Sequence, residues 1–249
     1  MKRSKRDLEG RWAVVTGAEG GIGKEICIQL ARRGASLVMV GIQDGPLFES
    51  AMEIASRWKC EALPLRLDLT ENDALQRMEE FLDSRQIVPY ILVNNAGIFS
   101  FRSVADTSQQ KVDCFISLHV KAVTDLTRVF CRRMAEAGEG RVLNMSSMSC
   151  WMPMPGIALY SATKAYIRVF SRAMHYEMKD NNVSVTVACP GGIATDLFGL
   201  PDNLKRLAVR LRVLDTPEAF ARKAVDKMMK GRRQYINGLL NRFSIFFVG

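Results

Sequence analysis

The sequence predicts an α/β fold in which one doubly wound parallel sheet carries helices on both of its faces. Two observations predict it: short runs rich in Val, Ile and Leu alternate with longer amphipathic stretches, and the runs are apolar throughout. Strands buried on both faces have this composition in parallel sheets, and alternating βα units build a doubly wound fold. No internal repeat or linker interrupts the pattern, so we expect a single domain over residues 1–249.

The elements follow one another in regular alternation. Each expected strand is short and apolar, and the strands cover residues 12–16, 36–40, 62–67, 90–93, 140–145 and 183–188. Each expected helix has an inward apolar face, and the helices cover residues 25–33, 47–59, 72–85, 111–136 and 159–179. Gly34 is expected to end the first helix.

Composition limits the class of protein. With 48% hydrophobic and 24% charged residues, the chain is an ordinary globular protein. The net charge of +9 is compatible with an anionic ligand, a membrane surface or nucleic acid, and equally with a solvated surface. The positive charge gathers near the N-terminus and between Lys205 and Arg242. Because no basic motif is interleaved with aromatic residues, we expect no nucleic-acid partner.

Cysteine and histidine usage excludes other classes. The six cysteines form no CxxC pair and only two histidines are present, so we expect no metal site. Cysteines in apolar runs indicate buried thiols and a reducing compartment, so we expect a cytoplasmic protein. The basic start leads into polar residues rather than a signal sequence, and no apolar stretch is long enough to span a membrane.

A glycine-rich turn joins the first strand to the first helix. Backbone N–H groups and the positive end of a helix at such a turn can hold a pyrophosphate, and glycine lets the backbone approach it. The glycines alone could equally form a structural turn. The residues expected to contact a dinucleotide here are Thr16, Gly17, Gly21, Ile22 and Gly23.

The pattern Thr-Gly-x-x-x-Gly-x-Gly at this turn resembles the short-chain dehydrogenase/reductase family, which has a Rossmann-type fold. Three further segments, in the same order over residues 8–196, strengthen the resemblance. They are an aspartate after the third strand, an Asn-Asn-Ala-Gly segment after the fourth and a Pro-Gly-Gly loop after the sixth. The resemblance implies cofactor contacts from Asp68, Leu69, Asn95, Ala96, Gly97, Pro190, Gly191, Ile193 and Thr195.

Tyr160, Lys164 and Ser147 form the expected catalytic group. Tyr160 and Lys164 are four residues apart on one helix and therefore share a face, and Ser147 follows the fifth strand. We expect the ammonium to lower the pKa of the tyrosine, which then exchanges a proton with the alcohol, while the serine holds the substrate oxygen. The resemblance implies that Tyr160 and Lys164 also contact the nicotinamide ribose. A tyrosine and a lysine at this spacing also occur by chance on amphipathic helices.

The sequence departs from the family at a fourth catalytic position. His119 stands where the family has an asparagine that holds a water in a proton relay. A histidine could hold such a water or move a proton itself, or it could weaken turnover. The alternative function is therefore a cofactor-binding scaffold or sensor with little turnover.

Cofactor choice depends on the end of the second strand. An acid there binds the ribose 2′-hydroxyl of NAD, and a nearby arginine accepts the 2′-phosphate of NADP. Gly41 stands in the place of the acid and Ile42 in the place of the arginine. Gly20 stands where members of the family that bind NADP often have another basic residue. Because residue 41 carries no acid that would repel a phosphate, the sequence favours NADP(H) over NAD(H).

The substrate is expected to be a hydrophobic ketone or alcohol of steroid, sphingoid or 3-oxoacyl type. Residues 193–215 are expected to form a lid with an apolar face and basic residues between the apolar ones. The apolar residues Trp151, Met152, Met154, Ile157 and Leu159 precede the expected catalytic tyrosine. The basic lid and the apolar C-terminal tail could also lie on a membrane surface. The helices over residues 111–136 and 159–179 are the expected interface of a homodimer or homotetramer.

Overall fold

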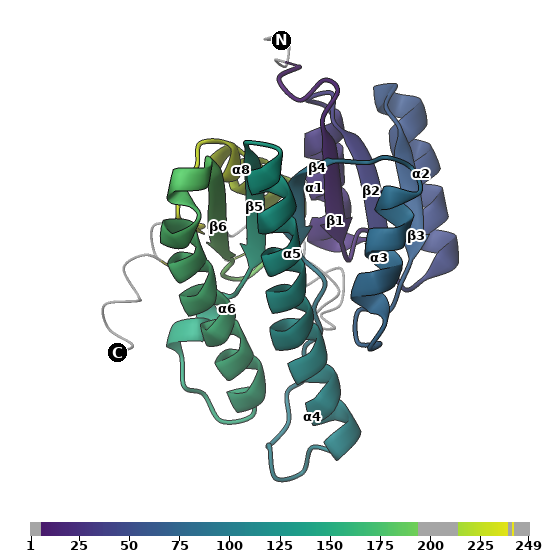
Figure 1. The fold of residues 1–249 in the computed structure, drawn as a ribbon. Helices are drawn as coiled ribbons and strands as arrows, with labels where there is room; N and C mark the ends of the chain where they lie inside the picture. The colour runs from purple at the N-terminus through teal and green to yellow at the C-terminus, as the bar shows by residue number, and fades with distance from the viewer. Residues whose placement is uncertain (1–5, 194–213, 239–240, 242–249) are drawn as a thin grey trace.

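The computed structural model describes residues 6–193, 214–238 and 241, and these contain one sheet of seven strands. The strand order is β3-β2-β1-β4-β5-β6-β7, and all neighbouring strands run parallel. The chain starts in the middle of the sheet, builds outward to β3 and returns to the other side of β1 (Figure 1). The predicted doubly wound parallel sheet is therefore confirmed.

Six of the strands lie where the sequence places them, within a residue or so. Their bounds are β1 Trp12–Thr16, β2 Ser36–Gly41, β3 Ala62–Arg66, β4 Pro89–Asn94, β5 Gly140–Met145 and β6 Val183–Cys189. The seventh strand, β7 at Gln234–Ile236, pairs with β6 and was not predicted.

The helices connect the strands and cover both faces. Their bounds are α1 Gly21–Ala31, α2 Asp44–Trp58, α3 Ala74–Asp83, α4 Gln109–Ile116, α5 Ala122–Glu136, α6 Ala158–Glu177 and α8 Pro217–Met229. Short 3₁₀ turns lie at Met148–Trp151 and Lys179–Asn181.

The core has two layers because the strands bury side chains on both faces. Ala13 and Val15 of β1 pack in one cluster with α1, α2 and α8, whereas Val14 packs in another with α3 and α5. In Figure 1, α3, α5 and α6 cover the face toward the viewer and α1 and α8 the face behind. This alternation between two apolar layers is the physical basis of the runs seen in the sequence.

The first helix and the long central helix differ most from their predicted limits, and the other predicted helices agree within three residues at each end. The first begins at Gly21 rather than at residue 25, because the helix starts within the glycine turn itself. The long helix predicted over residues 111–136 is divided by a π-helical turn at Ser117–Lys121. Such turns insert a residue into the helix and are frequent at functional sites.

Helix α8 was not predicted either, although its start carries a signal. The Thr216 hydroxyl accepts a hydrogen bond from the Ala219 N–H at 3.2 Å, and Pro217 occupies the first turn. A threonine cap followed by proline is a typical helix start. The helix buries Phe220 and Met228 against the sheet.

Candidate active site

A cavity of about 450 Å³ opens at the carboxyl ends of β1, β4 and β5. Parallel sheets bind ligands at this edge, where the strand order reverses. Residues from separate loops meet there, and the lining is formed by Gly17, Glu19, Gly20, Gly21, Ile22, Gln43, Asn95, Ala96, Gly97, Ile98, Met145, Ser146, Tyr160, Lys164 and Pro190. The structure thus brings the glycine turn, the Asn-Asn-Ala-Gly segment and the tyrosine–lysine pair together.

Thr16 and Asn95 fix the glycine turn against β4. The Thr16 hydroxyl accepts hydrogen bonds from the backbone N–H groups of Asn95 and Ala96, both at 3.0 Å. In return, the Asn95 amide donates to the carbonyl oxygens of Thr16 and Gly17, both at 3.0 Å. These bonds hold the two loops at a fixed separation across the floor of the cavity.

Glycine is required at two positions of this turn. Gly17 has φ of +62°, and a Cβ there would lie 2.9 Å from the Ala96 Cα. A Cβ on Gly23 would overlap the Gly17 carbonyl oxygen. The start of α1 therefore packs directly on the turn, and Gly21 and Ile22 of its first turn line the cavity, an arrangement suited to a pyrophosphate. On this observation the residues present fit a dinucleotide.

Of the candidate cofactor residues after β6, only some line the cavity among those that the structure describes. Pro190 lines the cavity, and the Gly191 N–H donates to the Asn237 side chain at 2.6 Å. Ile193 is buried and forms a bridge with Asp215. Thr195 and residues 194–213 of the expected lid lie outside the described residues, as does the C-terminal tail.

Asp68 and Leu69 follow β3 but are absent from the described lining of the cavity. The Asp68 carboxylate accepts hydrogen bonds from the backbone N–H and hydroxyl of Thr70, at 2.8 and 2.7 Å. Leu69 packs against the apolar layer beneath α3. The aspartate therefore caps the loop that leaves β3, a role that does not itself require a ligand.

Tyr160 and Lys164 lie one turn apart on α6 and are almost completely buried. The Lys164 ammonium donates to the Met145 carbonyl at 3.1 Å and lies 5.6 Å from the centre of the Tyr160 ring. Burial lowers the pKa of Lys164 to about 8. The ammonium is consequently still mostly protonated at neutral pH.

The pKa of Tyr160 differs from the expectation. The sequence argument had Lys164 lower it, but burial has the largest effect and raises the pKa, while a hydrogen bond with Ser147 acts in the opposite direction. The pKa rises because the loss of hydration on burial destabilises the phenolate by more than the hydrogen bond with Ser147 stabilises it. The phenol is therefore protonated at neutral pH.

Ser147 begins the 3₁₀ turn after β5. Its hydroxyl accepts a hydrogen bond from the Ser149 N–H at 3.2 Å and also bonds to Tyr160. This places Ser147 beside the phenol, although it is not among the residues that line the 450 Å³ cavity. The hydroxyl and the phenol can thus meet the same atom of a substrate.

His119 lies in the π-helical turn and is fully buried. Its Nε2 receives the Ile98 N–H at 3.1 Å, and its Nδ1 lies 3.0 Å from the Thr163 hydroxyl. An Nε2 that accepts from an amide carries no proton, so Nδ1 carries it and donates to Thr163. The Thr163 hydroxyl then donates to the Tyr160 carbonyl at 2.9 Å.

This chain of bonds uses both nitrogens of the imidazole. Burial, with a smaller effect from Lys164, lowers the pKa of His119 to about 2, so the ring is neutral at physiological pH. A Cβ on Gly97 would lie 3.1 Å from the His119 Nε2 and 3.4 Å from the Lys164 Nζ. The glycine therefore lets the segment after β4 approach His119 and Lys164 closely.

Several polar residues that support the site were missed in the sequence. The Ser146 hydroxyl donates to the Lys164 carbonyl at 2.7 Å, which ties β5 to α6. The Asn94 amide donates to the Asn144 side chain at 2.8 Å, and the Asn144 amide donates to Ser171 at 2.9 Å. Polar side chains inside apolar strands were the signal, because a buried amide requires a partner.

An apolar wall lies beside the phenol. Phe99 packs edge-on to Tyr160 with ring centres 5.1 Å apart, and Phe115 and Ile157 belong to the same buried cluster. Ile98, Phe99 and Leu159 are partly buried against it. Any substrate that reaches Tyr160 from this side meets carbon atoms rather than charges.

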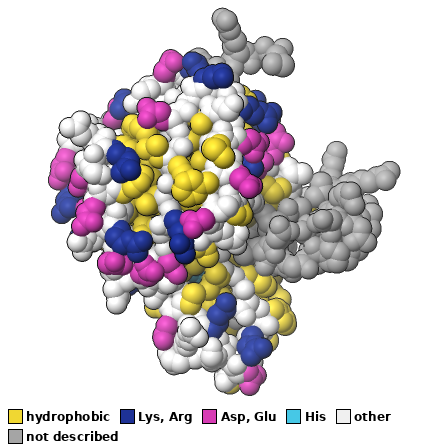
Figure 2. Space-filling model, turned by 90° about the vertical axis from the view of Figure 1, so that its right-hand side faces the viewer, with side chains coloured by type: hydrophobic (Ala, Val, Ile, Leu, Met, Phe, Trp, Pro, Cys, Tyr) yellow, Lys and Arg dark blue, Asp and Glu magenta, His cyan; other side chains and the backbone are white. Residues whose placement is uncertain are grey.

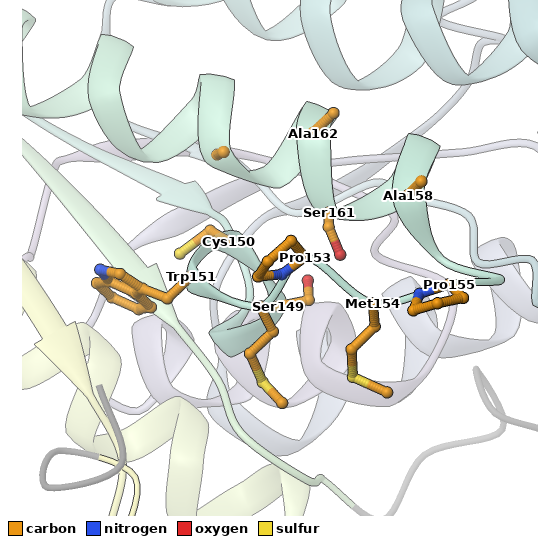
Figure 3. Close-up of a pocket in the computed structure, with 11 residues that line it drawn as sticks. Ser149, Cys150, Trp151, Pro153, Met154, Pro155, Ala158, Ser161 and Ala162 are labelled. Carbon is orange, nitrogen blue, oxygen red and sulfur yellow. The ribbon is translucent and has the colours of Figure 1, made fainter. Parts of the chain in front are cut away.

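A second cavity, of about 530 Å³, lies along another side of α6 (Figure 3). Trp151, Met152 and Met154, expected near the substrate, line it together with Ala158 and Ala162. Helical geometry turns Ala158 and Ala162 away from the side that carries Tyr160 and Lys164. These three residues therefore do not build the wall beside Tyr160.

The described surface mixes charges of both signs. On the side that carries α2 and α3, Lys and Arg side chains alternate with Asp and Glu (Figure 2). Pairs such as Lys24–Glu53 and Arg66–Asp44 account for part of this pattern.

All six cysteines are free thiols. Over the described part of the chain, every helix is too short or too polar to cross a membrane.

Comparison with known proteins identifies the family. The model of the short chain dehydrogenase family matches residues 11–202. The very-long-chain 3-oxoacyl-CoA reductase-A of Danio rerio is 32% identical over 234 residues, which cover 92% of this chain and 70% of that protein. Among the curated relatives, the chain spans between 31% and 72% of their length.

Two solved structures share the fold over nearly the whole chain. A 7β-hydroxysteroid dehydrogenase superposes with a TM-score of 0.86 at 27% identity, covering 98% of this chain and 93% of that one. A short-chain dehydrogenase from Sphingobium yanoikuyae in complex with NADPH superposes with a TM-score of 0.83 at 24% identity, covering 95% and 92%. The named relatives are reductases and dehydrogenases, which gives the scaffold alternative no support. The chain belongs to the short-chain dehydrogenase/reductase family and is an oxidoreductase acting on CH–OH groups.

Proposed function

We propose that the protein reduces a hydrophobic ketone to a secondary alcohol with a nicotinamide cofactor. One observation carries the proposal: Tyr160 and Lys164 are buried one turn apart on α6 and line the 450 Å³ cavity, and Tyr160 also packs against the apolar wall. The phenol thus faces the place where a carbonyl oxygen and a cofactor can meet.

The cofactor would be held by the glycine turn and the loops opposite it. Gly21 and Ile22 at the start of α1 would bind the pyrophosphate, and Asn95, Ala96 and Gly97 would flank the riboses. Lys164 would bind the nicotinamide ribose, and Pro190 would border the nicotinamide. When bound, the nicotinamide supplies the hydride that reduces the carbonyl carbon.

Tyr160 would act as the general acid. Because burial raises its pKa, the phenol holds a proton at neutral pH and can give it to the oxygen of the reduced carbonyl. The Ser147 hydroxyl would hold that oxygen and stabilise the negative charge that develops on it. The protonated phenol is the form that a general acid in ketone reduction requires.

His119 would position the catalytic helix rather than carry a proton. Both of its nitrogens are engaged, and its bond to Thr163 leads directly to the backbone of Tyr160. An imidazole with a pKa of about 2 takes up no proton during turnover at neutral pH. This role differs from the water relay that the family resemblance implies.

The substrate class follows from the wall beside Tyr160. Phe99 and Ile157 offer apolar contact, and the similarity to a very-long-chain 3-oxoacyl-CoA reductase and a 7β-hydroxysteroid dehydrogenase supports a bulky apolar ketone. A steroid, sphingoid or 3-oxoacyl ketone meets this description. The lid that would close over the substrate falls within the undescribed residues 194–213.

The test is a panel of ketones assayed by the absorbance of the reduced cofactor. Long-chain 3-oxoacyl thioesters, 3-ketosphinganine and steroid ketones should give higher kcat/KM values than keto sugars of similar carbonyl reactivity. A preference for the sugars would contradict the substrate class. Cofactor binding without turnover of any ketone would favour a sensor instead.

The outer side of α6 supports self-association. Val169 is 62% exposed and Tyr166 is 37% exposed, and Ile116 of α4 is exposed nearby in the same layer of helices. Exposed apolar side chains that gather on neighbouring helices are typical of subunit contacts. We include in the proposal that two copies pair through α5 and α6.

The peripheral membrane contact expected from the lid and tail stays a prediction, because both segments lie outside the described residues. Pelleting of the protein with anionic liposomes at low salt tests it.

A further inference from the structure

The end of β2 holds a carboxylate that does not come from β2. Gly41 ends the strand without a side chain, and the Glu19 carboxylate from the glycine turn lies over it. A Cβ built on Gly41 would overlap the Glu19 Oε2. The Glu19 carboxylate therefore lies where the side chain of a larger residue 41 would begin.

The two oxygens of this carboxylate have different surroundings. Oε1 accepts a long hydrogen bond of 3.4 Å from the Ile42 N–H. Oε2 is buried and has no hydrogen-bond partner among the described residues. A buried carboxylate oxygen is costly unless a donor meets it, so the geometry indicates that a ligand supplies one.

Among the described residues, no cation pairs with the Glu19 carboxylate. Glu19 and Gln43 line the cavity at this end, and among the described lining residues Lys164 is the cationic one, placed beside Tyr160 on α6. Arg66 lies beside Gly41 in the sheet register, but its guanidinium is 3.3 Å from the Asp44 carboxylate and is absent from the described lining. The local charge at this end is therefore negative.

A vicinal diol and a phosphate ester respond to such a carboxylate in opposite ways. The 2′- and 3′-hydroxyls of an adenosine ribose donate hydrogen bonds, which would satisfy Oε2. A 2′-phosphate offers only acceptors and a negative charge, and would be repelled. We propose that Glu19 is the specificity-determining residue of the cofactor site and makes this protein prefer NAD(H) to NADP(H).

This inference rests on the proposed dinucleotide function and reverses the preference that the sequence favours. The sequence argument found no acid at residue 41, which removes a repulsion toward phosphate. The folded chain restores that repulsion from a residue 22 positions earlier. The residues at the end of β2 do not reveal this acid, because it belongs to the turn after β1.

The experiment measures dissociation constants of NADH and NADPH for the full chain by nicotinamide fluorescence. We expect wild type to bind NADH at least about tenfold more tightly, because a hydrogen bond to a charged group is lost with the phosphate. Glu19→Gln should weaken NADH binding and strengthen NADPH binding. The ratio of the two dissociation constants should shift by about tenfold or more toward NADPH. Circular dichroism and thermal unfolding check that the variant is folded.

Glu53→Gln is the matched control. It removes one negative charge from an exposed pair with Lys24, outside the described lining of the cavity, and should leave the ratio unchanged. Gly41→Ala is a second test, since its Cβ displaces the Glu19 carboxylate without removing it, and it should weaken NADH. Wild type that prefers NADPH, or a Glu19→Gln ratio equal to that of wild type, overturns the proposal. Binding of neither cofactor to wild type instead overturns the proposed function.

Discussion

The two sides of helix α6 use similar small and polar residues for different purposes. On the inner side, the Lys164 ammonium and the Thr163 hydroxyl are buried and have defined partners. On the side turned toward the second cavity, the Ser161 hydroxyl is equally buried but has no hydrogen-bond partner among the described residues. Ala158 and Ala162 accompany it there (Figure 3).

The difference shows what each side is built to do. Buried polar groups with several fixed partners hold an orientation, which a proton donor needs. Alanines and a lone hydroxyl beside methionines instead form a shallow apolar surface suited to contact. Substitutions on the inner side should therefore change rates, whereas substitutions on the exposed side should change association.

The largest effect is expected from Tyr160→Phe. Removing the phenol hydroxyl takes away the proposed acid, so the rate of ketone reduction should fall by about 10²- to 10⁴-fold. Cofactor affinity should change little, because the ring remains in place. Steady-state kinetics and fluorescence titration measure the two quantities separately.

Tyr166→Phe is the matched control on the exposed side of the same helix. It removes a hydroxyl that bonds to the Thr124 hydroxyl at 2.7 Å, away from the cofactor cavity. Its rate should stay within about twofold of wild type, as for most exposed substitutions. Equal losses from both tyrosines would mean that α6 responds to any lost hydroxyl and that the two sides do not differ.

A smaller effect is expected from Thr163→Val, which keeps the shape of the side chain and removes its hydroxyl. The His119 Nδ1–H then loses its acceptor and the Tyr160 carbonyl loses the hydroxyl donor, at a cost of about 1–3 kcal/mol in stability. If His119 positions α6, kcat should fall several-fold while the pH profile keeps its shape. A new or lost ionisation between pH 5 and 7 would show that His119 carries a proton.

The pH dependence of stability isolates His119 itself. Its pKa is about 2 in the folded chain and about 6.5 in the unfolded chain. Between these pH values, the imidazole is therefore protonated in the unfolded chain and neutral in the folded chain. The free energy of unfolding should thus fall as pH drops from 6.5 toward 2, by about 1.4 kcal/mol per pH unit. His119→Asn should flatten this slope in urea titrations at pH 7 and 5. Equal slopes for wild type and His119→Asn would contradict the burial of a neutral ring.

The sequence anticipates the inner side of α6 better than the rest of the site. Tyr160 and Lys164 follow from helical spacing, and β1 to β6 follow from apolar runs that two layers bury. The π-helical turn at Ser117–Lys121 could not be predicted, because its extra residue leaves the apolar pattern of the long helix intact. Thr163 and Glu19 were missed because their partners are distant in the sequence.

The smallest effect on catalysis is expected from Val169→Asp on the exposed side of α6. Val169 is absent from the described lining of the cofactor cavity, so the rate should stay within about twofold of wild type. A charge in the proposed contact should nevertheless weaken self-association, which sedimentation velocity measures. Val88→Asp introduces the same charge at a valine that is also 62% exposed, in the loop before β4, and should leave the oligomer intact. If both variants sediment like wild type, the pairing surface lies elsewhere, and the apolar side of α6 requires another explanation.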